Sequence, residues 1–253
     1  MIRSMKPHDF FDPRRRSALA SAAVSAAALI LRPRPAVAQD GAPGKVRIGI
    51  IGAGRIGGTV GGFWVEAGHP VMFSSRDPAQ VEALVGKLGP PARGGTVAEA
   101  VDFGEVVFLA VPYSAMPEIG ADYGAKLAGK VVLDAGNAVE ARDGAIAGEA
   151  ERAGIGLTSQ KYLPGARLVR AFNTLGYTIL EREANRPEPR LAIPIAGDDA
   201  AAVQIAAGLV RDAGFEPVVV GKLADARRIQ RGGPGYGQAV SAAELRKILS
   251  LPQ

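Results

Sequence analysis

A glycine-rich turn, GAGRIG at residues 52–57, is the feature that most constrains the fold of this chain. It follows an apolar segment at 45–51 that we predict as a strand, and it leads into a predicted helix at 57–67. Glycine permits the tight turn, lets a ligand approach the backbone, and allows close packing of helix on strand. Free N–H groups and the helix dipole favour an anion there. This strand-turn-helix context predicts a dinucleotide site. Its predicted residues are Gly52, Gly54, Arg55, Ile56 and Gly57.

The second predicted strand, residues 70–74, ends in Ser74, Ser75 and Arg76. A carboxylate at this place would accept from a ribose hydroxyl and repel a 2′-phosphate. A guanidinium instead binds phosphate through a planar set of N–H groups, and two hydroxyls can donate to its oxygens. Asp77 precedes Pro78 and is predicted to cap the next helix. The sequence therefore favours NADP(H) over NAD(H), the alternative being that Arg76 points into solvent.

Strands and helices alternate along the rest of the chain. Strands are predicted at 93–96, 106–111, 131–133, 168–172, 191–196 and 217–220, and helices include 97–103, 200–212 and 242–249. Such alternation predicts an α/β, Rossmann-type fold with a doubly wound, mainly parallel sheet and helices on both faces. Residues 39–253 are predicted to form this NADP-binding domain with a short C-terminal extension, in which 227–237 is an irregular, mobile loop.

Ligands of open parallel sheets bind beyond the carboxyl ends of the strands. After the predicted strand at 106–111, a rigid turn could present a wall to the nicotinamide. Two neutral amides, Asn137 and Asn173, follow the next two strands and suit carboxamide or ribose hydroxyl groups, with capping or turn roles as the alternative. Tyr113 and His69 are predicted to be structural, and Asp199 to cap a helix. The candidate binding residues of this edge are Ala110, Val111, Pro112, Asn137 and Asn173.

The chain has no cysteine and only two histidines. That composition excludes disulfides, thiolate nucleophiles and sulfur-ligated zinc, and argues against a histidine metal site. No general acid or metal ligand set emerges, and no catalytic side chain is predicted. Hydride transfer between two ring cofactors requires position and polarity from the protein rather than reactive side chains.

The positive charge is confined to the N-terminus. Residues 1–38 hold seven of the 30 Lys and Arg and two of the 25 Asp and Glu, which leaves 23 of each sign in 39–253. A neutral body argues against nucleic-acid binding.

Residues 1–38 carry Arg14–Arg16, an Ala-rich apolar stretch and an Ala-Val-Ala end. This pattern is typical of a twin-arginine-like signal peptide cleaved after Ala38, and predicts export to the periplasm, with a cytoplasmic location as the alternative. No apolar run is long enough for an integral membrane segment.

Several motifs occur in a familiar order over about residues 45–222. They are VRIGIIGAGRIGGT, VMFSSRDP, VVFLAVPY, VVLDAGN, LVRAFNTLG and IPIAGDD. In this order the chain resembles the coenzyme F420-dependent NADP reductase family (NADP oxidoreductase, F420-dependent), and that family resembles the cytosolic domain of membrane ferric reductases. The resemblance implies hydride transfer between NADP(H) and a deazaflavin (coenzyme F420) or flavin acceptor, a small molecule. It also implies that Gly52, Gly54, Gly57, Ser75 and Arg76 hold NADP, and that Val111 and Pro112 lie near the nicotinamide.

In that family the C-terminal tail covers the second ring cofactor and contributes to oligomers, so a homodimer is expected. The region after Val220 is short and glycine-rich here. Two alternatives stay open. One is a non-catalytic NADP-binding module. The other is a pyrroline-5-carboxylate reductase-like imine reductase, although that reading calls for a helical dimerisation domain where strands are predicted at 191–196 and 217–220.

Overall fold

The computed structural model describes residues 44–252, which lie in one compact unit, residues 39–253. The predicted signal peptide and its cleavage site fall outside the described residues, so export stays a prediction. Within residues 44–252, no helix combines the length and the apolarity that a bilayer crossing requires.

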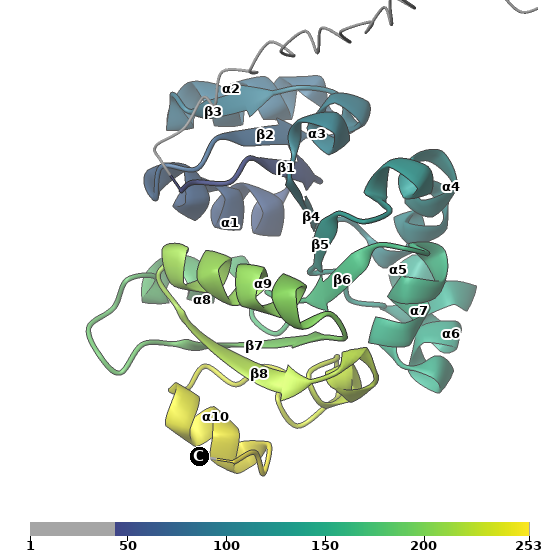
Figure 1. Cartoon of the computed structure of the whole chain (residues 1–253), viewed down its shortest axis with the longest axis vertical. Helices are drawn as coiled ribbons and strands as arrows, with labels where there is room; N and C mark the ends of the chain where they lie inside the picture. The colour runs from purple at the N-terminus through teal and green to yellow at the C-terminus, as the bar shows by residue number, and fades with distance from the viewer. Residues whose placement is uncertain (1–43, 253) are drawn as a thin grey trace, which may run out of the picture. The chain divides into compact units, whose positions relative to one another are not determined.

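An eight-stranded sheet forms the centre of the unit, in the order β3-β2-β1-β4-β5-β6-β7-β8 (Figure 1). Neighbouring strands run parallel except β6 and β7. The prediction of a Rossmann-type, doubly wound, mainly parallel sheet is confirmed. The strands are β1 (Ile48–Ile51), β2 (Val71–Ser74), β3 (Ala92–Gly94), β4 (Val106–Leu109), β5 (Val131–Asp134), β6 (Arg167–Arg170), β7 (Ala192–Gly197) and β8 (Glu216–Gly221).

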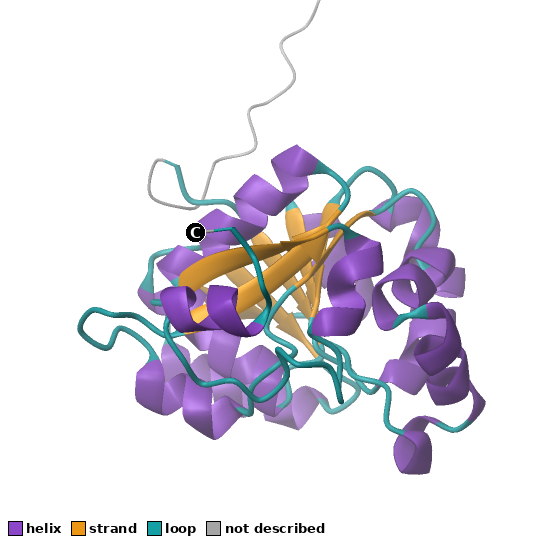
Figure 2. Cartoon of the chain, turned by 90° about the horizontal axis from the view of Figure 1, so that it is seen from below, coloured by secondary structure: helices purple, strands orange, loops and turns teal. Residues whose placement is uncertain are grey.

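Helices cover both faces of the sheet (Figure 2). One face packs against α1 (Arg55–Glu66), α2 (Pro78–Leu88), α8 (Tyr177–Glu183) and α9 (Ala200–Asp212). The other packs against α3 (Val97–Phe103), α4 (Met116–Leu127), α6 (Ala145–Ala153), α7 (Ile155–Tyr162) and α10 (Ala242–Ile248), with the 3-10 turns η1 (Tyr113–Ala115) and η2 (Leu223–Arg228). A short helix, α5 (Glu140–Asp143), follows β5. The two apolar cores on either face explain why the central strands are buried along their whole length.

The first core is centred on Trp64 of α1, which is fully buried. Its ring makes edge contacts with Phe108 and Phe172, at centroid distances of 5.1 and 5.8 Å. Its indole N–H donates to the carbonyl oxygen of Leu209 in α9 at 2.8 Å. The glycine-turn helix is thereby fixed to the far half of the chain, and burial of an aromatic side chain of this size contributes about 2–3 kcal/mol.

Two departures from the predicted elements shape the ligand edge. The strand predicted at 168–172 stops at Arg170, because Phe172 has a φ of 59°, a left-handed conformation that cannot continue a strand. The predicted strand at 106–111 stops at Leu109, two residues before Val111. The residues after Leu109 and after Arg170 therefore form turns at the carboxyl edge of the sheet, where the candidate site lies.

Candidate nucleotide-binding site

The glycine turn has the shape of an open cradle. Gly52 adopts a φ of +100°, and the N–H groups of Gly52 and Ala53 donate to the carbonyl oxygen of Ser74 at 3.0 and 2.9 Å. A Cβ on Gly57 would lie 1.9 Å from the Gly52 oxygen, whereas a Cβ on Gly54 would meet nothing within 4 Å. Gly54 caps α1 without a side-chain hydrogen bond, and the first turn carries no acid. The open space at Gly54 and the first N–H groups of α1, which have no partner within the helix, fit a pyrophosphate.

The end of β2 differs in part from the sequence-based expectation. Ser74 is fully buried, and its hydroxyl donates to the carbonyl oxygen of Ile50 at 2.6 Å. Ser74 therefore joins β2 to β1 and does not present a donor to a ligand, which corrects the role we expected for its side chain. Ser75 is half-buried, and its hydroxyl lies 3.2 Å from Gln80 Oε1 and accepts from the N–H of Asp77.

Arg76 and Asp77 have separate surroundings. The carboxylate of Asp77 accepts from the N–H groups of Ala79 and Gln80, at 3.1 and 3.3 Å, and so caps α2 as predicted. Arg76 is exposed and makes no hydrogen bond or ion pair with any residue in 44–252. The charge available to a ligand at this strand end is therefore the guanidinium.

Arg55 and Ile56 flank the cradle on two sides. The Arg55 guanidinium lies over the ring of Tyr177, 5.3 Å from its centroid, at the start of α8. Ile56 is half-buried and packs against the first core. A cation over an aromatic face is held in place at modest energetic gain. Arg55 is therefore held beside the anion site by an aromatic ring rather than by an ion pair with a carboxylate.

The turn after β4 lies directly against the cradle. A Cβ on Gly52 would lie 2.5 Å from the oxygen of Ala110 and 2.8 Å from Val111 Cγ1. Pro112 is exposed, whereas Tyr113 is fully buried. The structure thus brings Ala110, Val111 and Pro112 together with the glycine turn at the switch point of the sheet, and leaves Tyr113 in the interior as expected.

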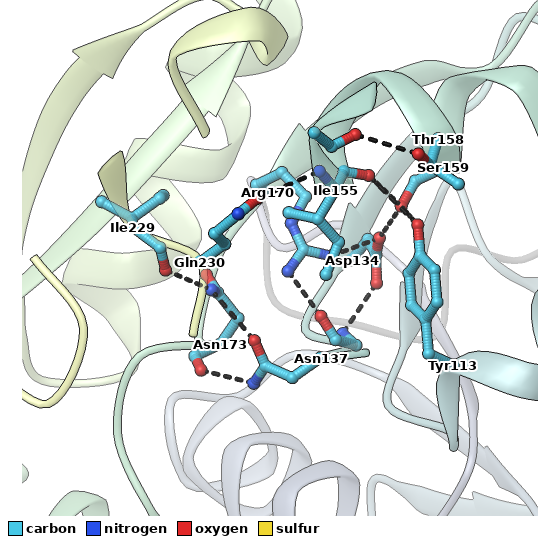
Figure 3. Close-up of polar contacts among 12 residues, drawn as sticks. Tyr113, Asp134, Asn137, Ile155, Thr158, Ser159, Arg170, Asn173, Ile229 and Gln230 are labelled. Atoms are coloured by element: carbon cyan, nitrogen blue, oxygen red, sulfur yellow. Dashed lines mark hydrogen bonds and ion pairs between the residues drawn. The ribbon is translucent and has the colours of Figure 1, made fainter. Parts of the chain in front are cut away.

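Asn137 and Asn173 lie side by side at the ends of β5 and β6 (Figure 3). Asn137 Nδ2 donates to the carbonyl oxygen of Asn173 at 2.7 Å, and Asn173 Nδ2 donates to the carbonyl oxygen of Ile229 at 2.8 Å. Asn173 Oδ1 is buried and has no partner within the described chain. An acceptor left unsatisfied in this way is costly unless a ligand or water donates to it. The pair is therefore suited to an amide or hydroxyl donor.

Sequence reasoning missed two charged residues beneath this edge, Asp134 and Arg170. Both side chains are fully buried and form an ion pair. The available signal was a charge at the last position of an otherwise apolar strand, VVLD in β5 and RLVR in β6. Their pairing brings together segments 36 residues apart.

A third missed residue, Asp143, connects the loops that follow β4 and β5. Its carboxylate accepts from the N–H groups of Ser114 and Val139, at 3.1 and 2.8 Å, and pairs with Arg142. Burial raises the pKa of Asp143, but hydrogen bonds from Arg142, Val139 and Ser114 outweigh it and lower the pKa from 3.8 to about 2. The carboxylate is therefore ionised over the whole neutral range.

An Asp143→Asn protein is expected to show a flatter dependence of stability on pH. Because the folded pKa is depressed, the stabilisation of about 2 kcal/mol is complete above about pH 5 and is lost as the pH falls towards 2. The variant should therefore be less stable than wild type at pH 7 and approach it in acid, as measured by urea unfolding. Asp102→Asn, at an exposed pair with Lys126, is the control and should change little. A constant gap at all pH values would contradict the assignment.

Comparison with known proteins identifies a family for part of the chain. The profile of the family described as NADP oxidoreductase, coenzyme F420-dependent, matches residues 47–138, the range from β1 to the turn after β5. Residues 47–138 belong to that family. The resemblance inferred from the ordered motifs is thus confirmed, and the coenzyme F420-dependent NADP oxidoreductase domain contains the glycine turn, Arg76 and Asn137. Residues 47–138 are therefore similar to an NADP-dependent oxidoreductase domain.

Individual relatives extend the likeness beyond this domain. Metalloreductase STEAP3 of Rattus norvegicus is 30% identical over 212 residues, which are 78% of this chain and 39% of the rat protein. Glycerol-3-phosphate dehydrogenase [NAD(P)+] of Pseudomonas fluorescens is 30% identical over 107 residues, 38% of this chain and 30% of that protein. The chain thus spans less than half the length of these curated relatives.

Among solved structures, a hypothetical protein from Sinorhizobium meliloti has a TM-score of 0.66 and 27% identity, over 78% of this chain and 95% of that one. A proposed F420-dependent NADP-reductase from Arthrobacter sp. FB24 has a TM-score of 0.58 and 21% identity, over 72% of this chain and 87% of that one. The second likeness supports the fold alone.

Proposed function

We propose that this protein is an NADP(H)-dependent oxidoreductase that transfers hydride between NADP(H) and a deazaflavin (coenzyme F420) or flavin acceptor. The observation that carries the proposal is the combination of an open cradle at Gly54 with a free guanidinium at Arg76. The carboxylate of Asp77 is engaged in capping α2, which leaves the Arg76 guanidinium as the charged group offered to a 2′-phosphate at this strand end. When bound, NADPH supplies the hydride, and the chain supplies the binding and orientation.

Each part of the site has a role in this proposal. The first backbone N–H groups of α1 and the Arg55 guanidinium hold the pyrophosphate. Ser75 and Arg76 hold the 2′-phosphate. Ala110, Val111 and Pro112, together with Ile56, border the nicotinamide, and Asn137 and Asn173 receive polar groups of the same half of the nucleotide. The residues that carry these roles are those assigned from the sequence, apart from the Ser74 hydroxyl.

The choice of hydride acceptor depends on whether a side chain at the ligand edge can donate a proton to it. Tyr113 is the phenol nearest the turn after β4, and burial together with the charge of Asp134 raises the pKa of Tyr113 far above its ordinary value. It therefore keeps its proton and makes a poor general acid. A ring acceptor that exchanges its proton with water requires no such group, whereas an imine must be protonated at the site. This difference favours a deazaflavin or flavin over an imine.

Two other functions remain as defined alternatives. Imine reductases share the fold, as shown by the Pseudomonas sp. enzyme with a TM-score of 0.53 and 14% identity over 72% of this chain and 57% of that one. A non-catalytic module would bind NADP(H) and transfer no hydride. Both would use the same cradle, so only the acceptor distinguishes them from the proposed reductase.

The test is an acceptor screen with the purified protein. NADPH oxidation is followed by absorbance in the presence of coenzyme F420, FMN, a ferric chelate or pyrroline-5-carboxylate, each under anaerobic conditions. Oxidation with coenzyme F420 or FMN supports the proposal. Oxidation with the imine alone establishes the imine reductase, and tight NADPH binding without oxidation by any acceptor establishes the module.

A further inference from the structure

The buried pair of Asp134 and Arg170 carries an inference that rests on the proposed binding of NADP(H). We infer that this ion pair positions residues 135–137 and thereby presents Asn137 to the nucleotide. Neither charged group reaches the ligand surface, since both side chains have no exposed area. They are positioning residues, and their effect on the nucleotide is transmitted through Asn137.

The register of the sheet places the two charges face to face. β5 and β6 are parallel, and Asp134 and Arg170 are register partners at their last positions. Arg170 Nη1 donates to Asp134 Oδ2 (Figure 3). The pair therefore lies at the carboxyl edge of the sheet, immediately beneath the turn that leads to Asn137.

Both charges hold the backbone of that turn. Asp134 Oδ1 accepts from the N–H of Gly136 at 2.7 Å, and Arg170 Nη2 donates to the carbonyl oxygen of Gly136. The turn is also tightly packed, because a Cβ on Gly136 would lie 3.1 Å from Tyr113 Cδ2. Because the N–H and the carbonyl oxygen of Gly136 are both hydrogen-bonded, the backbone of this turn is fixed. The position of Asn137 at the ligand edge is fixed with it.

A set of hydroxyl groups fixes the pair from the opposite side. Ser159 Oγ of α7 donates to Asp134 Oδ2 at 2.7 Å, and the Tyr113 hydroxyl lies 2.9 Å from Ser159 Oγ. Tyr113 directly follows Val111 and Pro112 in the chain. The same buried network thus sets the turn after β4 and the turn after β5, which border the nicotinamide in the proposed function.

Stability alone gives a weak reason for burying these charges. A buried ion pair can usually be replaced by apolar residues of similar volume with little loss of stability, because desolvation offsets the attraction. Arg170 Nε in addition has no partner within the described chain. A buried charge with an unsatisfied N–H group is expected where it fixes the geometry of a site. Here the Asp134–Arg170 pair fixes the backbone geometry of residues 135–137.

The experiment is a double-mutant cycle read out as NADPH affinity. The pair is replaced by Asp134→Leu with Arg170→Met, and Asn137→Ala is introduced into this background and into wild type. NADPH dissociation constants are measured by fluorescence titration, and thermal unfolding reports the fold. We expect removal of the pair to weaken NADPH binding about tenfold, and Asn137→Ala to weaken wild type about tenfold. In the pairless background Asn137→Ala should add less than about twofold, because coupled residues are not additive.

Two further variants keep the result decisive. Arg167→Met, at the opposite end of β6 in a half-exposed pair with Asp199, is the matched control and should leave NADPH affinity unchanged. Should the pairless protein fail to fold, Arg170→Lys takes its place. It keeps the charge but replaces the two nitrogens that contact Asp134 and Gly136 by one, and it should show the same tenfold loss.

The outcomes separate this inference from the proposed function. If the folded pairless protein, or Arg170→Lys, binds NADPH as wild type does, the positioning role is wrong and the function stands. The same holds if Asn137→Ala costs an equal factor in both backgrounds. If wild type itself does not bind NADPH, the proposed function falls and this inference falls with it.

Discussion

A Gly54→Val protein is expected to fold normally and to lose most of its affinity for NADP(H). Gly54 has φ −74° and ψ −159°, an extended conformation with a negative φ that does not require glycine, and a Cβ there meets no atom within 4 Å. The new side chain would occupy the space in which the pyrophosphate approaches the backbone. Losing two charge-assisted hydrogen bonds should cost about 3–6 kcal/mol, or about 150-fold to 20,000-fold in the dissociation constant.

The measurement is NADPH titration alongside circular dichroism of the same preparations. Gly208→Val is the control, because Gly208 lies in α9 away from the cradle and a Cβ there also has open space. It should bind NADPH as wild type does. An unchanged dissociation constant for Gly54→Val would show that the nucleotide does not use this turn.

Arg76→Ala should discriminate between the two nucleotides. Removing the guanidinium removes charge-assisted hydrogen bonds to a 2′-phosphate, which should cost about 1.5–3 kcal/mol, or roughly tenfold to 150-fold in NADP⁺ affinity. NAD⁺ lacks that phosphate, so its affinity should be nearly unchanged. Parallel calorimetric titrations of NADP⁺ and NAD⁺ measure the difference.

Arg55→Ala provides the matched comparison, because it removes another exposed cation beside the same cleft. Since Arg55 flanks the pyrophosphate position, which both nucleotides share, it should weaken NADP⁺ and NAD⁺ by similar factors. Equal losses for the two nucleotides in Arg76→Ala would instead mean that Arg76 does not contact the 2′-phosphate.

Elements defined by local chemistry were predicted well from the sequence. The helices at 97–103 and 200–212 occur at the predicted residues, because Thr96 and Asp199 accept from the first N–H groups and so fix the starts. The strand-turn-helix at 48–66 likewise follows from three glycines and an apolar strand. Helix caps and glycine turns are formed by residues that are close together in the chain, so a single sequence is enough to predict them.

Features that depend on distant partners were missed. The antiparallel pairing of β7 with β6 joins residues far apart in sequence, and no local pattern specifies strand direction. Asp134 follows the strand predicted at 131–133 and Arg170 lies within the strand predicted at 168–172, and only the register of β5 and β6 shows that the two charges pair. The Ser74 hydroxyl was expected to face a ligand, but its carbonyl partner, Ile50, belongs to the neighbouring strand. Satisfaction of buried polar groups is decided by tertiary structure.

The loop before α10 is anchored at the ligand edge by two contacts. Ile229 accepts from Asn173, and the N–H of Gly237 donates to the carbonyl oxygen of Thr174 at 3.0 Å. The nucleotide cradle, by contrast, lies wholly within 47–138. Substitutions in 229–240 are therefore expected to act on the site through Asn173 and Thr174 rather than through the glycine turn. In the proposed function, residues 229–240 thus act on the nicotinamide half of the site through Asn173, at a distance along the chain from the glycine turn that holds the pyrophosphate.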